Sequence, residues 1–206
     1  MSARRKDLPR DLTLLLEILR RRYAAEAAVA KPALAAELVS LLEAWPNVRQ
    51  PVSANPSQLP ASAYFIDALA AGTRGPEAAL ASGLAALASF LRWTYSYPAR
   101  RDQPDLAKRV AFSQIVGPGG LLRSDELRLG LTLIAPTTQY PAHHHPAIET
   151  YLVVSGTASW RLGSEHERPQ PPGTCIFHPS GEAHAMRSHE DPLLAIYSWR
   201  GDVLSP

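Results

Sequence analysis

Hydrophobic residues recur at two different spacings along this chain. Up to about residue 92, leucine and alanine return every three or four positions, which is typical of the buried face of an amphipathic helix. Helices are expected over 9–30, 32–45, 61–71 and 76–92, with an irregular, proline-rich connection over 46–60. Leucine stripes of this kind form packing surfaces, so we expect these helices to pack against the rest of the chain.

From about Ala111 the spacing becomes two, which indicates strands, as where Leu127, Leu129, Leu131 and Leu133 alternate with other residues. Further short strands are expected over 149–155, 158–162, 174–177, 184–187 and 193–199, separated by glycine, proline or serine. Short, regularly spaced strands predict an antiparallel barrel or jelly roll. The aromatic segment 93–98 is either an edge strand or an extended arm lying on that barrel.

The expected fold class is therefore α+β, with a helical N-terminal region over 1–100 followed by a C-terminal antiparallel β-barrel over 101–206. The helices would close one face or one end of the barrel. The helices could equally form a contact between subunits, so a homodimer is also compatible with the sequence.

Charge and composition exclude several classes of partner. The net charge is only +2, and the basic runs 4–6 and 20–22 are too short to indicate nucleic-acid binding. The apolar run 12–19 contains Glu17 and precedes three arginines, which fits neither a signal peptide nor a membrane span. We therefore expect a cytoplasmic protein with no nucleic-acid or membrane partner. Its single cysteine, Cys175, cannot form an internal disulfide, and we expect it to fill a strand face.

A dense set of metal-ligating side chains lies within residues 142–151. Alternate side chains of an extended chain share a face, so His143, His145, Glu149 and Tyr151 can converge even if Pro146 bends the strand. A further ligand is available from a later strand region, at His184. Imidazole and carboxylate ligands suit a divalent Zn, Fe, Mn, Ni or Co ion without selecting among them. We assign no role to the other histidines, which we expect either at the surface or beside the ligands without binding the metal: His144, His166, His178 and His189.

Tyr151 extends the interpretation from metal binding to catalysis. It lies two residues beyond Glu149, on the same expected face, so its phenol can approach the cation. A nearby positive charge stabilises phenolate and lowers a tyrosine pKa, which would make Tyr151 a general base. The alternative is a strand tyrosine packed inside the barrel, with its hydroxyl on a backbone carbonyl.

The spacing of these residues resembles the two sequence motifs of the cupin family. The first motif runs His143-x-His145-x3-Glu149-x6-Gly156, and the second runs Gly173-x5-Pro179-x-Gly181-x2-His184. Two positions depart from the family pattern, since Thr137 replaces the glycine that usually opens the first motif and Ser188 the asparagine that usually closes the second. Both are structural positions, so neither departure affects the expected metal site.

A closer resemblance involves Tyr140, Tyr151 and Trp199 together with the helical N-terminal region. This combination resembles the cupin-type dimethylsulfoniopropionate lyases, in particular the DddQ type. The resemblance implies a C-terminal cupin barrel with one divalent metal ion per chain, and cleavage of dimethylsulfoniopropionate to dimethyl sulfide and acrylate. The resemblance implies metal ligation by His145, Glu149 and His184, with His143 as a fourth ligand or hydrogen-bond partner. It also implies that Tyr151 is the base and an occasional metal ligand, and that Tyr140 and Trp199 line the pocket.

Two other functions remain open at this point. Another metal-dependent cupin enzyme, a dioxygenase or an isomerase acting on a small carboxylate or a sugar, would use the same ligands. A non-enzymatic cupin would bind a small ligand in the barrel, although residues 9–92 contain no helix-turn-helix with a basic recognition face. A small, closed, aromatic-lined pocket beside Tyr151 would favour the lyase, whereas an oxygenase would need ferrous iron and dioxygen.

Overall fold

The computed structural model describes residues 7–46 and 55–204. The basic run 4–6 and most of the proline-rich connection, residues 47–54, lie outside the described residues. The expected order, helices followed by antiparallel strands, is confirmed. The proposed division of the chain near residue 100 stays a prediction.

The first two helices confirm the sequence interpretation closely. Helix α1 spans Leu8–Ala27, and the Asp7 side chain caps it by accepting a hydrogen bond from the Arg10 backbone amide at 3.4 Å. Helix α2 spans Pro32–Glu43, with proline in its first turn, where no backbone N–H is needed. The buried stripe of α1 contains the leucines and Tyr23 that predicted it.

The third and fourth expected helices are each divided between two types of helix. Residues Pro60–Tyr64 form a 3₁₀ turn before α3 (Phe65–Gly72), and α4 (Ala78–Leu87) ends in a second 3₁₀ turn, Ala88–Phe90. The Ser62 hydroxyl donates to the Leu59 carbonyl at 2.7 Å, which favours the tight turn. A further one-turn helix, α5 (Leu106–Arg109), was not expected.

The strands form a five-stranded sheet in the order β1-β2-β9-β4-β7 and a four-stranded sheet in the order β3-β8-β5-β6. All pairings within these sheets are antiparallel. The strands are β1 Val110–Val116, β2 Leu127–Ile134, β3 Gln139–His143, β4 Ile148–Ser155, β5 Ala158–Leu162, β6 Arg168–Gln170, β7 Cys175–His178, β8 His184–Ser188 and β9 Leu193–Arg200.

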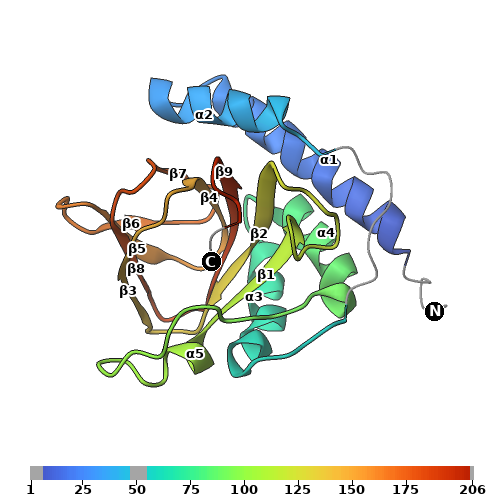
Figure 1. Ribbon diagram of the computed structural model, residues 1–206. Helices are drawn as coiled ribbons and strands as arrows, with labels where there is room; N and C mark the ends of the chain where they lie inside the picture. The colour runs from blue at the N-terminus through green and yellow to red at the C-terminus, as the bar shows by residue number, and fades with distance from the viewer. Residues whose placement is uncertain (1–6, 47–54, 205–206) are drawn as a thin grey trace.

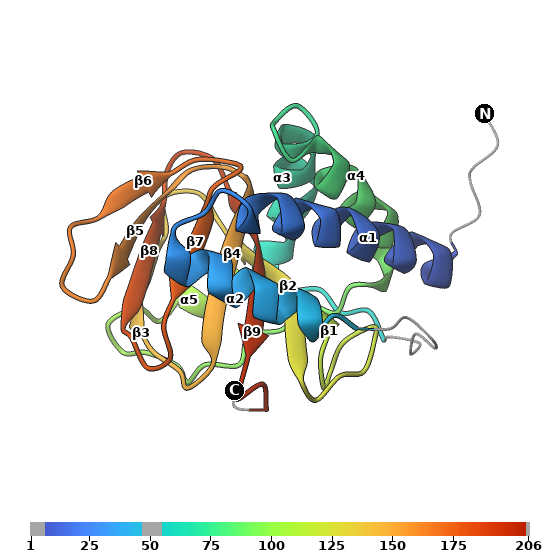
Figure 2. The ribbon, with the colours of Figure 1, turned by 90° about the horizontal axis from the view of Figure 1, so that it is seen from above.

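Helices cover one face of the five-stranded sheet, and the four-stranded sheet covers the other (Figure 1). Seen from above, α1 and α2 lie side by side across the five-stranded sheet (Figure 2). The two-residue period assigns side chains to these layers: Leu127, Leu129, Leu131 and Leu133 join the core under the helices. A second core, with Tyr151, lies between the sheets. The five-stranded sheet is therefore buried on both faces.

Polar contacts attach the helices to the strands that will carry the site. Arg22 of α1 binds Glu77 at 2.7 Å and the Gly173 carbonyl, just before β7, at 2.8 Å. The Arg200 guanidinium, at the end of β9, forms two hydrogen bonds to the Glu37 carboxylate of α2, at 3.0 and 2.7 Å. The helices therefore fix the ends of β7 and β9. Cys175 of β7 packs partly buried against the helix–sheet core, as expected, and burial raises its pKa to about 12.

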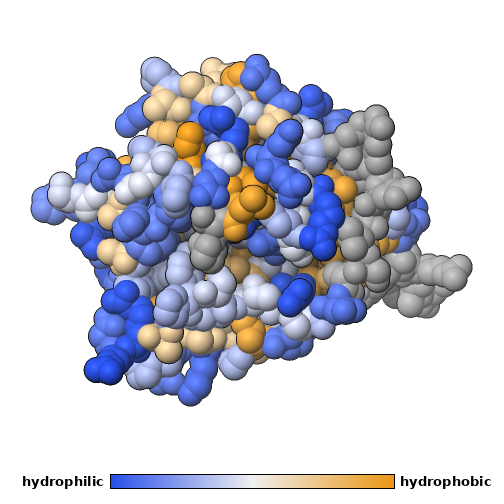
Figure 3. All heavy atoms as spheres, viewed as in Figure 1, coloured by the Kyte–Doolittle hydropathy of each residue, from blue (hydrophilic) through white to orange (hydrophobic). Residues whose placement is uncertain are grey.

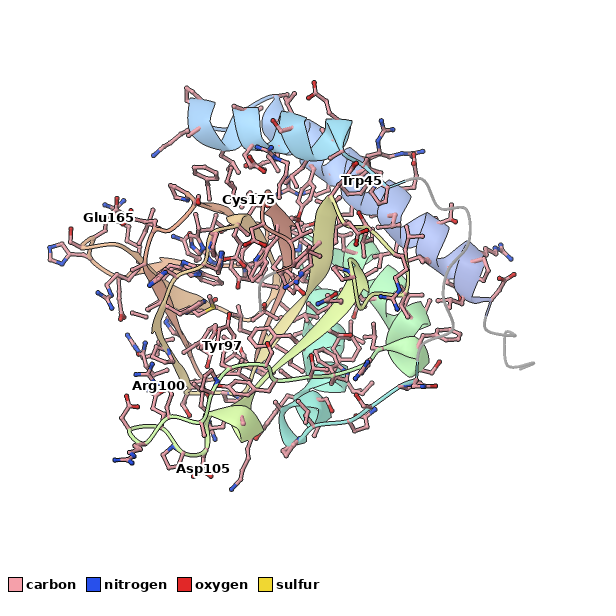
Figure 4. The ribbon with its side chains drawn as sticks, in the orientation of Figure 1. Trp45, Tyr97, Arg100, Asp105, Glu165 and Cys175 are labelled. Atoms are coloured by element: carbon pink, nitrogen blue, oxygen red, sulfur yellow. The ribbon has the colours of Figure 1, made fainter. Side chains whose placement is uncertain are left out.

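The aromatic segment 93–98 forms an extended arm on β1. Thr94 and Phe112 exchange two backbone hydrogen bonds, both of 2.8 Å, as an isolated antiparallel bridge. The arm places Tyr97 between the two sheets (Figure 4), where its ring centroid lies 5.8 Å from that of Phe112 and 6.1 Å from that of Tyr140. It therefore contributes an aromatic wall to the barrel interior.

Hydrophobic side chains are concentrated in the interior. The face shown in Figure 3 is largely hydrophilic, and its hydrophobic residues lie in small groups. No helix within residues 7–46 or 55–204 combines the length and the apolar character that a membrane crossing requires.

The two departures from the cupin motifs lie next to each other. Thr137 adopts a left-handed backbone conformation with φ 51°, which explains why the motif favours glycine there. Ser188 accepts a hydrogen bond from the Thr138 amide at 2.9 Å and donates one to the Ala135 carbonyl at 2.6 Å. The serine hydroxyl therefore ties the start of β3 to the end of β8.

Replacing Thr137 with glycine is expected to raise the free energy of unfolding by up to about 1 kcal/mol. The left-handed conformation strains a β-branched residue by about 1–3 kcal/mol, and the greater freedom of glycine in the unfolded chain offsets part of the relief. Urea denaturation of the two proteins measures the difference. A clear loss of stability in the glycine variant would contradict this explanation of the motif position.

Candidate functional site

One cross-strand row on the inner face of the five-stranded sheet organises the site. Arg128 pairs with Trp199, Trp199 with Glu149, and Glu149 with His178, across strands β2, β9, β4 and β7. Residues directly opposite one another on neighbouring strands share a face. The register therefore aligns a cation, an indole, a carboxylate and an imidazole inside the barrel.

The Glu149 carboxylate lies at the centre of a histidine cluster and is only 1% exposed. Its Oε2 atom lies 3.1 Å from His145 Nε2, 3.1 Å from His178 Nδ1 and 3.2 Å from His184 Nε2. Its Oε1 atom accepts a hydrogen bond from Trp199 Nε1 at 2.6 Å. Burial by itself would raise the pKa of Glu149, but the hydrogen-bond donors around it, among them His178 Nδ1, outweigh burial and hold that pKa well below its usual range. Glu149 is therefore a carboxylate.

Backbone carbonyls select the tautomer of the histidines proposed as ligands. In each case Nδ1 lies within hydrogen-bond distance of a carbonyl oxygen and donates to it: His143 to Pro141 at 2.9 Å, His145 to Ala147 at 3.1 Å and His184 to Glu182 at 3.0 Å. In the neutral ring this leaves a lone pair on Nε2. Metal-ligating histidines are oriented in the same way.

These tautomers make the cluster fit a metal ion. The Nε2 lone pairs of His145 and His184 and the Glu149 oxygen are all acceptors, although they lie about 3 Å apart. His184 Nε2 is also buried without a hydrogen-bond partner among the described residues. A divalent cation bound among these atoms satisfies all of them at once, because imidazole and carboxylate are its usual ligands.

Two overlapping groups of side chains could hold the ion. One is His143, His145 and His184, and the other is Glu149, His178 and His184; within each group the ligand atoms lie within 4.8 Å of one another. His184 belongs to both. His143 pairs with His184 between β3 and β8, and burial lowers its pKa to about 3, which keeps the ring neutral and able to bind a metal.

The structure brings together the four expected ligands, His143, His145, Glu149 and His184, but not on a single extended strand. His143 ends β3, Pro146 lies between strands, and Glu149 is the second residue of β4. Strand pairing, in addition to alternation along one strand, therefore produces the convergence.

His178 is the residue to which the sequence interpretation assigned no role, and of the two positions expected for it the structure shows the one beside the ligands and not the surface. Its side chain is fully buried beside Glu149, and its ring stacks on that of His184 at 4.0 Å. Strand β7 ends one residue later than expected, at His178, which places this histidine opposite Glu149. Its position directly before Pro179 of the second motif was the available signal. Of the others, His144 and His166 are exposed, and His189 binds the Ser159 hydroxyl.

Tyr151 lies one row away from Glu149 on the same face. Its side chain is 3% exposed, with its ring 5.4 Å from that of Trp160 and 5.6 Å from that of His178. Tyr151 lines the same cavity as Thr132 and Glu149. Burial, together with the negative charge of Glu149, raises the pKa of Tyr151 well above its ordinary value. Ionisation of this phenol therefore needs a positive charge nearby.

A cavity of about 50 Å³ lies beside this pair, lined by Glu149, Tyr151, Arg128 and aromatic side chains that include Tyr97, Phe112, Tyr197 and Trp199. Aromatic side chains therefore line a small cavity beside Tyr151 and Glu149. A larger hollow of about 690 Å³ is lined by polar residues such as Ser159 and His189, and it shares no residue with the histidine–carboxylate cluster.

The two residues expected to bind substrate both lie in the site. Tyr140 is 2% exposed, its ring centroid lies 4.3 Å from that of His143, and it lines a neighbouring cavity of about 190 Å³. Trp199 lines the first cavity, but it also donates to Glu149 and packs its ring 4.2 Å from that of His145. Trp199 therefore orients two of the proposed ligands, whatever else it binds.

The chain is similar in sequence to a known family of proteins. A family model described as dimethylsulfoniopropionate lyase matches residues 33–195. The chain is 33% identical to the dimethylsulfoniopropionate lyase DddQ of Ruegeria pomeroyi over 126 residues, which are 61% of this chain and 63% of that protein. It is also 33% identical to the putative dimethylsulfoniopropionate lyase DddL of Cereibacter sphaeroides over 166 residues, 80% of this chain and 68% of that protein.

Solved structures show the same architecture. The crystal structure of DddQ from Ruegeria pomeroyi DSS-3 superposes with a TM-score of 0.73 at 28% identity, covering 94% of both chains. A structure from a study of the lyases RdDddP and RnDddQII gives a TM-score of 0.70, also at 28% identity and 94% coverage of both chains. The expected α+β cupin fold is confirmed.

Proposed function

Since the chain belongs to the dimethylsulfoniopropionate lyase family, we propose that it cleaves dimethylsulfoniopropionate to dimethyl sulfide and acrylate by β-elimination. The observation that carries this proposal is the position of Tyr151. A buried phenol one row from the histidine–carboxylate cluster lines the same small, aromatic cavity as Glu149. That arrangement provides a base and a cation site around a substrate of few atoms.

The proposed ligands are His143, His145, Glu149 and His184, which together bind one divalent ion. When bound, such an ion supplies positive charge that offsets the substrate carboxylate and favours the phenolate of Tyr151. His178 keeps the Glu149 carboxylate in place through its Nδ1 hydrogen bond of 3.1 Å. Trp199 holds the other carboxylate oxygen.

In the proposed reaction Tyr151, as phenolate, takes a proton from the carbon next to the substrate carboxylate. The electron pair of that C–H bond forms the carbon–carbon double bond of acrylate. The C–S bond breaks, and its electron pair leaves with sulfur as neutral dimethyl sulfide. The proton remains on the Tyr151 oxygen until it passes to solvent, so atoms and charges balance.

The aromatic walls suit the sulfonium end of the substrate. A sulfonium is a soft cation without strong hydrogen-bond donors, and aromatic faces attract such cations. Tyr97 and Phe112 provide these faces in the cavity, and we propose that Tyr140 and Trp199 complete them. The aromatic side chains of this lining also limit the space left for water near the proton being transferred.

Headspace detection of dimethyl sulfide tests the proposal. Protein loaded with Zn, Fe, Mn, Ni or Co in turn is given dimethylsulfoniopropionate, and a metal-free sample is run beside each. We expect metal-dependent release that is the same with and without dioxygen. No release from any fully loaded sample would overturn the lyase, and a requirement for iron and dioxygen would favour an oxygenase instead.

Replacing His178 with alanine is expected to weaken metal binding by about 10- to 100-fold without abolishing it. The variant loses the hydrogen bond that orients Glu149 but keeps all four proposed ligands, and the loss of such a supporting contact has effects of this size. Titration against a competing chelator measures the change. His166→Ala, which removes an exposed histidine, is the control. Complete loss of metal in His178→Ala would indicate that His178 itself binds the metal.

A further inference from the structure

Arg128 is the cationic side chain among the described residues that line the cavity. It is 8% exposed, and its guanidinium carbon lies 4.6 Å from the centre of the Trp199 ring. In the cross-strand row Trp199 separates it from Glu149. A buried positive charge therefore lies in the same row as the proposed metal centre.

The hydrogen-bonding capacity of this guanidinium is not filled. One Nη2–H donates to the Val203 carbonyl, whereas Nε is buried without a partner among the described residues. No ion pair to Arg128 occurs within residues 7–46 and 55–204. Glu149, the carboxylate that lines the cavity, is already bound by Trp199 and His178.

A buried guanidinium with an unfilled donor is costly unless an anion pairs with it. Stacking on Trp199 occupies the face of the guanidinium but leaves its in-plane N–H groups available. Those groups match the two oxygens of a carboxylate, which arginine binds more specifically than lysine does. The chemistry of the position therefore calls for a small carboxylate in the cavity.

We propose that Arg128 binds the substrate carboxylate and thereby sets the direction in which the substrate enters the cavity. This inference rests on the proposed function, because it identifies the carboxylate as that of dimethylsulfoniopropionate. The charge of Arg128 repels the sulfonium and directs it toward the aromatic walls at Tyr97 and Phe112. Arg128 therefore selects a zwitterion over a simple sulfonium, and it supplements the metal centre in holding the carboxylate.

Binding of the two halves of the substrate tests this role without turnover. Propionate carries the carboxylate half, and ethyldimethylsulfonium carries the sulfonium half. Isothermal titration of each into the metal-loaded protein compares wild type with Arg128→Met. We expect propionate to bind at least about tenfold more weakly to the variant, a loss of about 1.4 kcal/mol. Ethyldimethylsulfonium should bind as well as before or more tightly, because a like charge has been removed.

Two further variants separate charge from packing. Arg128→Lys keeps the charge but not the planar fork, so its propionate affinity should fall between those of wild type and Arg128→Met. Arg123→Met removes an exposed arginine that does not line the cavity and should change neither affinity. Metal content and the thermal midpoint are measured for each variant.

Three outcomes would overturn the inference: no propionate binding by wild type, unchanged propionate affinity in Arg128→Met, or an equal loss for both halves. If Arg128→Met unfolds, Arg128→Lys decides, and propionate affinity equal to that of wild type would count against the carboxylate contact. Arg128-dependent propionate binding by a protein that releases no dimethyl sulfide would leave an anion site but remove the lyase. The two proposals can therefore fail separately.

Discussion

Replacing Tyr151 with phenylalanine is expected to lower the rate of dimethyl sulfide release by about 10²- to 10⁴-fold, the usual contribution of a general base. The substitution removes only the hydroxyl. The ring keeps its contacts with Trp160 and His178, so the barrel interior should not collapse. None of the four proposed ligands changes, and metal content should therefore stay at the wild-type level. Initial rates and bound metal are measured on the same samples.

A matched control removes a buried hydroxyl of helix α1 that contacts the opposite face of the same sheet. Tyr23 is fully buried on the helix side, where its hydroxyl bonds Ser198 Oγ at 2.7 Å. Tyr23→Phe should lose about 1 kcal/mol of stability, the usual value of one hydrogen bond, and release dimethyl sulfide at close to the wild-type rate. Near-normal release by Tyr151→Phe would remove the phenolate mechanism. Equal losses in the two variants would show that the effect is one of packing.

Much of the fold could be predicted from the sequence, because the spacing of hydrophobic residues along a helix or strand determines which layer of the protein buries their side chains. The leucines of β2 alternate in sequence and lie on the helix side of the sheet in the structure. In α1, the residues that recur every three or four positions, including Tyr23, are the ones that the structure buries. Glu149 and Tyr151 share a face because both lie on β4, two residues apart.

The parts that could not be predicted depend on the pairing between strands. His178 and Arg128 belong to the site only because β7, β4, β9 and β2 pair in one particular register. Alternation along β2 separates Arg128 from the leucines but does not show that its face is also buried. That face is enclosed by the four-stranded sheet and the arm at Tyr97, and of these elements only β3 is close to β2 in sequence.

Replacing His184 with alanine is expected to remove the metal and, with it, the release of dimethyl sulfide. His184 is the member common to both groups of potential ligands, so whichever group binds the ion loses a ligand. The loss also leaves the Glu149 charge and the neighbouring imidazoles buried without the cation that pairs with them. Metal content of the purified variant, measured by elemental analysis after dialysis, should fall to background.

His144→Ala provides the control, because that histidine lies within the first motif but is exposed to solvent. It should keep both metal and activity. Full metal occupancy in His184→Ala would mean that the histidine of the second motif is not a ligand, and both candidate groups would then be wrong. Loss of metal in His184→Ala but not in His178→Ala would instead favour the set His143, His145, Glu149 and His184. The pair of variants therefore tests the metal centre directly, whether or not the substrate has been identified correctly.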